Sequence, residues 1–154
     1  MHVVTSSLFL PAYRAYISPA SFTVLLRVFL RTTLTWYVSR GRAPLNIREF
    51  YAKTNPAPQP KPEDKLSVPA DANPWLPIIQ QSLAHNDDHL PKTQRALAHF
   101  ATVYGDRVAG TFSGLDGAEL VEGSLFARVA ELTANVADTT TTQLWHFGGF
   151  FETM

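Results

Sequence analysis

Prolines are concentrated in one stretch of this 154-residue chain, and they limit what that stretch can fold into. Eight of the eleven prolines lie between Pro44 and Pro77, and those at positions 56, 58, 60 and 62 alternate with other residues. A proline inside a helix removes a hydrogen bond and clashes with the preceding turn, so a regular helix is disfavoured there. Alternating prolines favour polyproline II, a semi-rigid extended conformation. We therefore predict a Pro-rich, extended surface linker over residues 54–73.

The longest helical pattern covers residues 19–40. Ser18 is a favoured helix N-cap, and the residue after it is a proline at the first helical position, where a missing N–H costs nothing. Gly41 is a natural left-handed C-cap. The segment is apolar on almost all sides, with a narrow polar stripe through Arg27 and Arg31. Such a helix is expected to be central and largely buried.

The other helical patterns are shorter, and the chain shows no internal repeat and no strand-like alternation. In one of them, the residues Leu97, Phe100, Ala101 and Tyr104 share the i, i+3, i+4, i+7 spacing of a buried helix face. We expect helices over residues 45–52, 74–84, 91–104 and 124–137. The predicted fold class is all-α, an irregular helical bundle with a central apolar helix, forming a single domain over residues 1–154.

Charge is distributed unevenly, although the formal net charge is zero. Residues 1–48 contain six arginines and no acidic residue, whereas residues 49–154 carry seven Lys or Arg against thirteen Asp or Glu. We expect the basic end to dock on the acidic remainder or on a partner segment. An organelle-targeting sequence is an alternative, but the segment is unusually apolar and interrupted by prolines. No basic motif with readout residues is present, so nucleic acid is not an expected partner.

The composition also bears on the compartment. The chain contains no cysteine, which excludes disulfides, thiolate metal sites and a cysteine nucleophile. The most apolar stretch has Arg27 and Arg31 in its middle, where each would cost a few kcal/mol in a bilayer, so no membrane span is expected. A cytoplasmic protein is the expectation.

Three of the five histidines and two adjacent aspartates lie in the stretch "LAHNDDHLPKTQRALAHF". On a continuous helix, His85 and His89 would share a face at the i, i+4 spacing that zincins use. Asn-Asp-Asp is turn chemistry, however, and Pro91 pushes the residue before it out of the helical region. We therefore expect a polar turn between two helices, with Asp88 near the N-terminus of the second, and no bound metal. A catalytic role for His85 and His89 at a pocket edge, with Asp88 orienting an imidazole, remains the alternative.

Four segments together resemble the questin oxidase-like family, in the order in which the family has them. They are "VTSSLFLP", "RGRAPLNIREFYAKTNP", "NPWLPIIQQSLAHNDDHLPKTQRALAHFATVYG" and "GSLFARVAELT". The resemblance is to the C-terminal part of the family, and it is most specific around the His85, Asp88, His89 and Lys92 segment. It implies an all-helical oxidoreductase of fungal secondary metabolism.

The resemblance also implies a reaction, namely Baeyer–Villiger-type oxygen insertion into a polycyclic aromatic polyketide with NADPH and O2, and it leaves a role for flavin open. On this view His85 and His89 are acid/base groups, Asp88 orients them, and Trp75, Phe100 and Tyr104 are aromatic walls. The chain would then be an active monooxygenase or an incomplete short form of one. The alternative is a non-enzymatic helical interaction module or a truncated gene product. In either case we expect an exposed apolar patch and self-association through it.

Overall fold

The computed structural model describes residues 1–55 and 73–139, and all regular secondary structure in these two ranges is helical. The all-α prediction is therefore confirmed. Most of the predicted linker lies outside the described residues. Within the chain, contacts separate into two compact units, which are described in turn, and the boundary between them falls between Leu45 and Asn46. The single-domain expectation for residues 1–154 stays a prediction.

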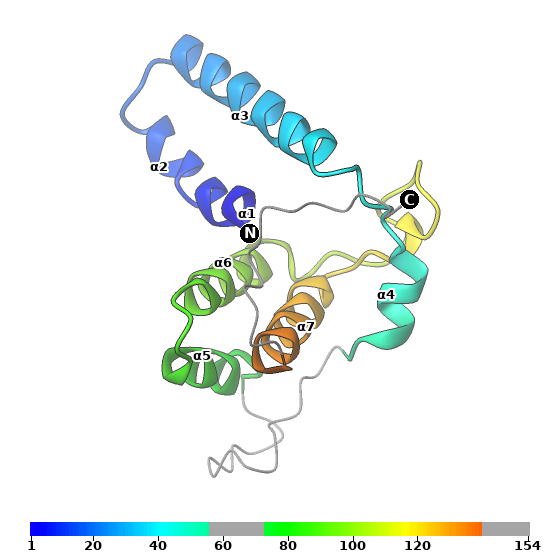
Figure 1. Ribbon diagram of the computed structural model, residues 1–154. Helices are drawn as coiled ribbons and strands as arrows, with labels where there is room; N and C mark the ends of the chain where they lie inside the picture. The colour runs from blue at the N-terminus through cyan, green and yellow to red at the C-terminus, as the bar shows by residue number, and fades with distance from the viewer. Residues whose placement is uncertain (56–72, 140–154) are drawn as a thin grey trace. The chain divides into compact units, whose positions relative to one another are not determined.

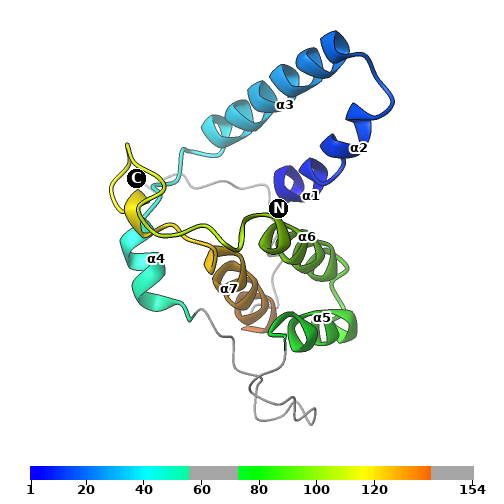
Figure 2. The same cartoon turned by 180° about the vertical axis from the view of Figure 1, so that it is seen from behind.

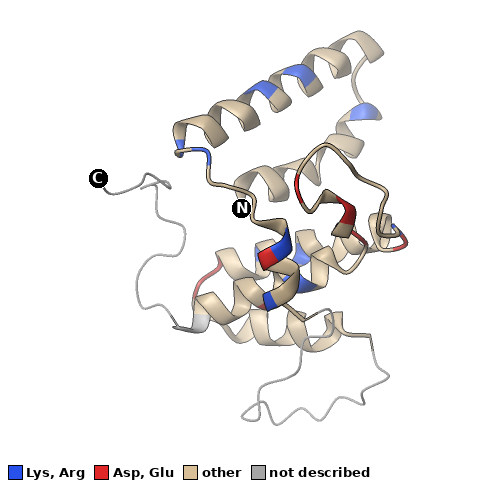
Figure 3. Cartoon of the chain, turned by 90° about the vertical axis from the view of Figure 1, so that its right-hand side faces the viewer, with Lys and Arg blue, Asp and Glu red and all other residues tan. Residues whose placement is uncertain are grey.

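The described part of the first unit contains three helices. The short helices α1 (His2–Ser7) and α2 (Leu10–Arg14) follow one another. The chain then turns, and the long helix α3 (Pro19–Ser39) runs back in contact with α2 (Figures 1 and 2). The sequence did not predict α1 or α2, because helices this short have little stability of their own. Arginine positions lie on α2 and α3, and none of the three helices carries Asp or Glu (Figure 3).

Helix α3 has the predicted ends but not the predicted burial. Its N-cap is Ser18, whose Oγ accepts a hydrogen bond from Ser21 N at 3.2 Å, and Gly41 just past its end has a φ of 90°. None of its residues is buried, so the expectation of a central, largely buried helix is wrong for the described structure. The reason is that only the side carrying Leu25 and Phe29 meets α1 and its neighbours.

The second unit has a core between three helices, α5 (Trp75–Ala84), α6 (His89–Tyr104) and α7 (Leu125–Thr139) (Figure 1). Each helix contributes one buried apolar residue to its centre: Ile78, Leu97 and Ala130. The fully buried Gln94 of α6 donates a hydrogen bond from Nε2 to Ala130 O at 2.8 Å and so joins α6 to α7. Of the predicted buried face of α6, Leu97 is buried, but Tyr104 is 43% exposed.

The short helix α4 (Ile47–Lys53) is held to the start of α7 by Arg128. The guanidinium donates to the carbonyl oxygens of Tyr51 and Thr54 at 3.2 and 2.5 Å and lies 4.8 Å from the centre of the Tyr51 ring. Its Nε donates to Ser124 Oγ at 2.8 Å. Because Tyr51 and Thr54 precede Arg128 by more than 70 residues, this one side chain fixes a long-range contact.

The loop between α6 and α7 folds back on itself. Gly123 N donates to Arg107 O at 2.8 Å, and Gly110 N donates to Glu119 O at 2.7 Å. A Cβ on Gly123 would lie 1.7 Å from the carbonyl oxygen of Gly105, so only glycine lets the two ends of the loop approach this closely. The 3-10 helix η1 (Ala118–Leu120) lies in this loop and contacts α4.

Candidate functional site

The turn between α5 and α6 brings an imidazole and two carboxylates together. Helix α5 ends at Ala84, residues 86–88 are irregular, and α6 begins at His89, so His85 and His89 are not on one continuous helix, as predicted. The carboxylate Oδ1 of Asp87 accepts the His89 backbone N–H at 2.9 Å and lies 2.8 Å from His89 Nδ1. His85 Nδ1 accepts the Asp87 backbone N–H at 3.0 Å.

Asp87, rather than Asp88, is the closer partner of the His89 imidazole. Oδ1 of Asp88 lies 3.3 Å from His89 Nδ1, against 2.8 Å for Asp87. Asp88 is the N-cap residue of α6, as expected, but its side chain caps no backbone N–H. Asp87 makes that bond instead, in the manner of an Asx turn. An aspartate tends to accept a hydrogen bond from the backbone N–H two residues further on, so the position of Asp87 two residues before His89 was a signal in the sequence that could have identified this pair.

Helix α6 starts two residues earlier than predicted. Leu90 is helical and buried although it precedes Pro91. The first four N–H groups of a helix have no partner within the helix, so a proline in the first turn breaks no hydrogen bond. The expectation that Pro91 excludes Leu90 from the helix is therefore wrong.

Lys92 completes the polar cluster of this turn. Its Nζ lies 2.5 Å from Asp88 Oδ2, four residues earlier. This hydrogen bond and the charge of Lys92 hold the pKa of the Asp88 carboxyl below its usual value. Ligand atoms of Asp87, Asp88 and His89 all lie within 4.8 Å of one another, a separation that a metal ion could bridge. Both carboxylates are already engaged by His89 and Lys92, so the arrangement is that of a polar turn containing a carboxylate–imidazole pair.

A pocket with aromatic walls lies at the other end of α6. It has a volume of about 380 Å³, and its walls are Tyr104, Phe112 and Phe126. The Tyr104 and Phe126 rings are stacked at 22°, with centroids 6.3 Å apart. Arg107 and Glu122 supply its charged groups. Its volume and lining suit a single aromatic ring system with a polar substituent.

The sequence identified this pocket only in part. Tyr104 lines it, and Phe100 lies behind, with its ring centroid 6.2 Å from that of Tyr104. Trp75 instead packs against the core formed by Ile78, Leu97 and Ala130. Arg107 and Phe112 were not predicted, because they come from an irregular loop whose path is set by backbone contacts rather than by a periodic pattern.

The polar turn and the aromatic pocket are too far apart to form one small-molecule site. Helix α6 has 16 residues from His89 to Tyr104. At a rise of 1.5 Å per residue this separates the two ends by about 22 Å. A pocket of even 1,000 Å³ is only about 12 Å across. The structure therefore does not bring the predicted acid/base residues to the predicted aromatic wall at Tyr104.

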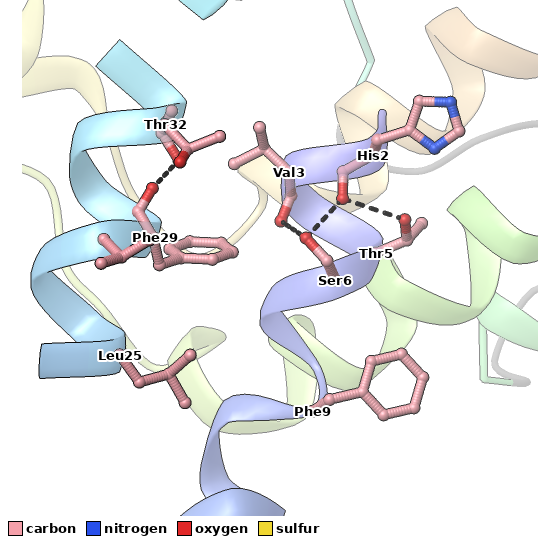
Figure 4. A pocket seen from close by; sticks show the side chains of 10 residues that line it. His2, Val3, Thr5, Ser6, Phe9, Leu25, Phe29 and Thr32 are labelled. Atoms are coloured by element: carbon pink, nitrogen blue, oxygen red, sulfur yellow. Dashed lines mark hydrogen bonds between the residues drawn. The ribbon is translucent and has the colours of Figure 1, made fainter. Parts of the chain in front are cut away.

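A second pocket, of about 470 Å³, lies in the first unit between α1 and α3 (Figure 4). Phe9, Leu25 and Phe29 line it with apolar groups. The hydroxyls of Ser6 and Thr33 also face it, but each donates its proton to a carbonyl oxygen of its own helix. The pocket is therefore a mainly apolar groove, and among the described residues that line it His2 is the only titratable one.

A model of the questin oxidase-like family matches residues 1–97, well over half of the chain. The chain belongs to this family. The match includes the polar turn and ends inside α6. It lies over the N-terminal part of the chain, so it does not support the expectation that only the C-terminal part of the family is represented, and the segment "GSLFARVAELT" falls outside it. Searches of curated proteins and of solved structures found no match.

Membership relates the chain to oxidoreductases of the questin oxidase type, and NADPH is the cofactor that the resemblance implies. Neither the aromatic pocket nor the glycine pattern of the chain shows features that would bind it. The aromatic pocket, at about 380 Å³, is near the lower end of the range of about 300–1,000 Å³ for ligand pockets. Among the described residues that line it, the one arginine, Arg107, shares the pocket with the carboxylate of Glu122, which would repel phosphate. The chain also has no Gly-x-Gly-x-x-Gly loop.

No helix among the described residues combines the length and the apolar character needed to cross a membrane.

Proposed function

We propose that the protein is an oxidoreductase of the questin oxidase type that inserts an oxygen atom beside the carbonyl of a polycyclic aromatic ketone, a Baeyer–Villiger-type reaction. The family match over residues 1–97 carries this proposal. In the overall reaction, O2 supplies one atom to the new ester and one to water, while a hydride donor and a proton supply the reducing equivalents. NADPH is the expected donor, and no residue is assigned to it.

The Asp87–His89 pair is the group best suited to proton transfer. An ionised Asp87 can only accept a hydrogen bond, so the 2.8 Å contact places the proton of a neutral His89 ring on Nδ1. Nε2, on the far side of the ring, is then the basic nitrogen. A histidine held in this way by a carboxylate serves as a general base in many enzymes. The His89 side chain is 35% exposed, so small reactants can reach it.

The aromatic pocket would serve as a separate binding site for a ring system. Because it lies about 22 Å from His89 along α6, a reaction at the polar turn requires walls other than Tyr104. His85, which accepts a hydrogen bond from Asp87 N, would position the turn rather than react.

A second candidate function is a non-enzymatic interaction module. One observation favours it, namely the number of large apolar side chains that α3 exposes: Val24, Leu26, Val28, Leu30, Leu34, Trp36, Tyr37 and Val38. A helix with this surface is suited to packing against a further protein element.

Turnover by the purified chain tests the first proposal. Incubation with an anthraquinone, NADPH and O2 should give a product heavier by one oxygen atom, detected by mass spectrometry, with matching oxygen consumption. His89→Gln and Asp87→Asn should each reduce the rate at least tenfold. His99→Gln, which changes an exposed histidine of the same helix, should leave the rate unchanged. Absence of turnover in the unmodified chain would favour the interaction module, and equal rates in all three variants would refute the assignment of His89.

A further inference from the structure

Helix α3 exposes two parallel strips of side chains with different chemistry. Leu26, Leu30 and Leu34 are four residues apart, so they lie along one face of the helix, and they are 40%, 59% and 53% exposed. Arg27 and Arg31 each follow a leucine directly and therefore lie about 100° further round the helix. Both arginines are exposed. We call these five residues the Leu–Arg surface.

The Leu–Arg surface is distinct from the face that packs inside the first unit. Leu25 and Phe29, which line the groove against α1, are each partly buried and lie on another side of the helix. No carboxylate among the described residues pairs with Arg27 or Arg31. The surface thus combines an apolar ridge, of the kind that packs into a second helix, with two cations that meet no carboxylate among the described residues of the first unit.

Charge indicates which helix would fit. A helix packed on the leucine ridge places its flanking residues beside the neighbouring strip, as the charged positions of a coiled coil do. Residues beside Arg27 and Arg31 would then be acidic. A second copy of α3 offers no acid, because residues 1–48 contain none, and it would bring arginine against arginine. In Figure 3 the long helix α3 carries blue positions and no red one.

A membrane surface fits less well. A helix that lies on a bilayer needs a broad polar face turned to water, opposite its apolar face. On α3 the exposed apolar residues Val24 and Val28 lie on the other side of the arginines from the leucines. The arginine strip is therefore narrow and bordered by apolar groups on both sides.

We propose that the Leu–Arg surface binds an amphipathic helix of another polypeptide whose apolar face is flanked by Asp or Glu residues spaced four apart. This interaction does not depend on the proposed oxidoreductase activity. It also replaces self-association through α3 as the use of this exposed apolar patch.

Two synthetic 21-residue peptides test the proposal. They share the same leucines at i, i+4 spacing and differ only in their flanking residues, which are Glu in one and Lys in the other. Fluorescence anisotropy with the full chain should show the Glu peptide binding about fivefold more tightly, since two exposed ion pairs contribute up to about 1 kcal/mol together. The preference should shrink as salt is added.

Substitutions locate the site. R27E/R31E should reverse the peptide preference, and R27Q/R31Q should abolish it without adding charge. R14E/R42E changes the net charge of the chain by the same amount as R27E/R31E but at positions outside α3. It should leave the preference unchanged. Leu30→Asp should weaken both peptides at least tenfold. Because these side chains are exposed, circular dichroism should show unchanged helix content.

Other outcomes would overturn the proposal. One is equal binding of the two peptides, and another is no binding of either. A third is that R27Q/R31Q keeps the preference of the unmodified chain for the Glu peptide. Sedimentation equilibrium that shows a dimer disrupted by Leu30→Asp would assign the surface to a second copy. Binding to phosphatidylglycerol vesicles that R27Q/R31Q abolishes, without binding to either peptide, would assign it to a membrane.

Discussion

Removing Arg128 should detach α4 from α7 and destabilise the second unit. The Arg128 side chain is 13% exposed, and its guanidinium donates to two backbone carbonyls near the end of α4, at 2.5 and 3.2 Å, and to Ser124 Oγ at 2.8 Å. A hydrogen bond from a charged group contributes about 1.5–3 kcal/mol. The carbonyls lie at a helix end, where water can replace the arginine in part. We therefore expect Arg128→Ala to lower the free energy of unfolding by about 3 kcal/mol, including about 0.5–1 kcal/mol from the lost contact with the Tyr51 ring.

Urea denaturation followed by far-ultraviolet circular dichroism measures this loss. Arg128→Lys keeps the charge but not the planar fork that reaches several acceptors, so its loss should be about half as large. The control is Arg95→Ala, which removes an exposed arginine of α6 and should change the free energy of unfolding by less than about 0.5 kcal/mol. If Arg128→Ala unfolded at the same urea concentration as Arg95→Ala, the assignment of the long-range contact to this side chain would be refuted.

Three further predictions concern other parts of the second unit. Burial raises the pKa of Tyr51 in the folded state. The contribution of the neutral phenol to stability is therefore complete below the ordinary tyrosine pKa of about 10 and is lost as pH rises through the pKa of the folded state. Tyr51→Phe should remove this pH dependence in urea denaturation at alkaline pH. Lys92→Met should raise the pKa of Asp88 toward its ordinary value in an NMR titration, because it removes the hydrogen bond and the charge that lower this pKa. The stabilisation that the pair contributes is present above about pH 3.9 and is lost as pH falls through the lowered pKa. An unchanged pKa would refute the pairing. Gly123→Ala should prevent the loop from closing, since its Cβ would meet the carbonyl oxygen of Gly105 at 1.7 Å, and the backbone N–H of residue 123 should then lose its protection from hydrogen exchange.

Local chemistry made the ends of several helices predictable. Ser18 and Gly41 mark the ends of α3 because a cap and a left-handed glycine act within a few residues of themselves. The same locality made the break between α5 and α6 predictable, since Asn-Asp-Asp favours a turn wherever it stands. The predicted start of α6 was wrong by two residues, because the first N–H groups of a helix have no partner within it, so a proline in the first turn removes no hydrogen bond.

The candidate site was only partly predictable, for a similar reason. The sequence singled out His89 and the adjacent aspartates, but the choice between Asp87 and Asp88 depends on distances of 2.8 and 3.3 Å that no spacing reveals. Phe112 and Arg107 reach the aromatic pocket through a loop closed by backbone hydrogen bonds, which leave no periodic pattern.

By itself the sequence determined the helical class, most helix ends and the family, because propensity, capping and motif order are local or linear properties of the chain. Tertiary structure decided which residues meet. It gathered Tyr104, Phe112 and Phe126 around one pocket, gave Arg128 its acceptors on α4, and left the apolar surface of α3 exposed where hydrophobicity alone predicted burial. Burial depends on which neighbours are present around a residue, and its own apolar character does not supply them.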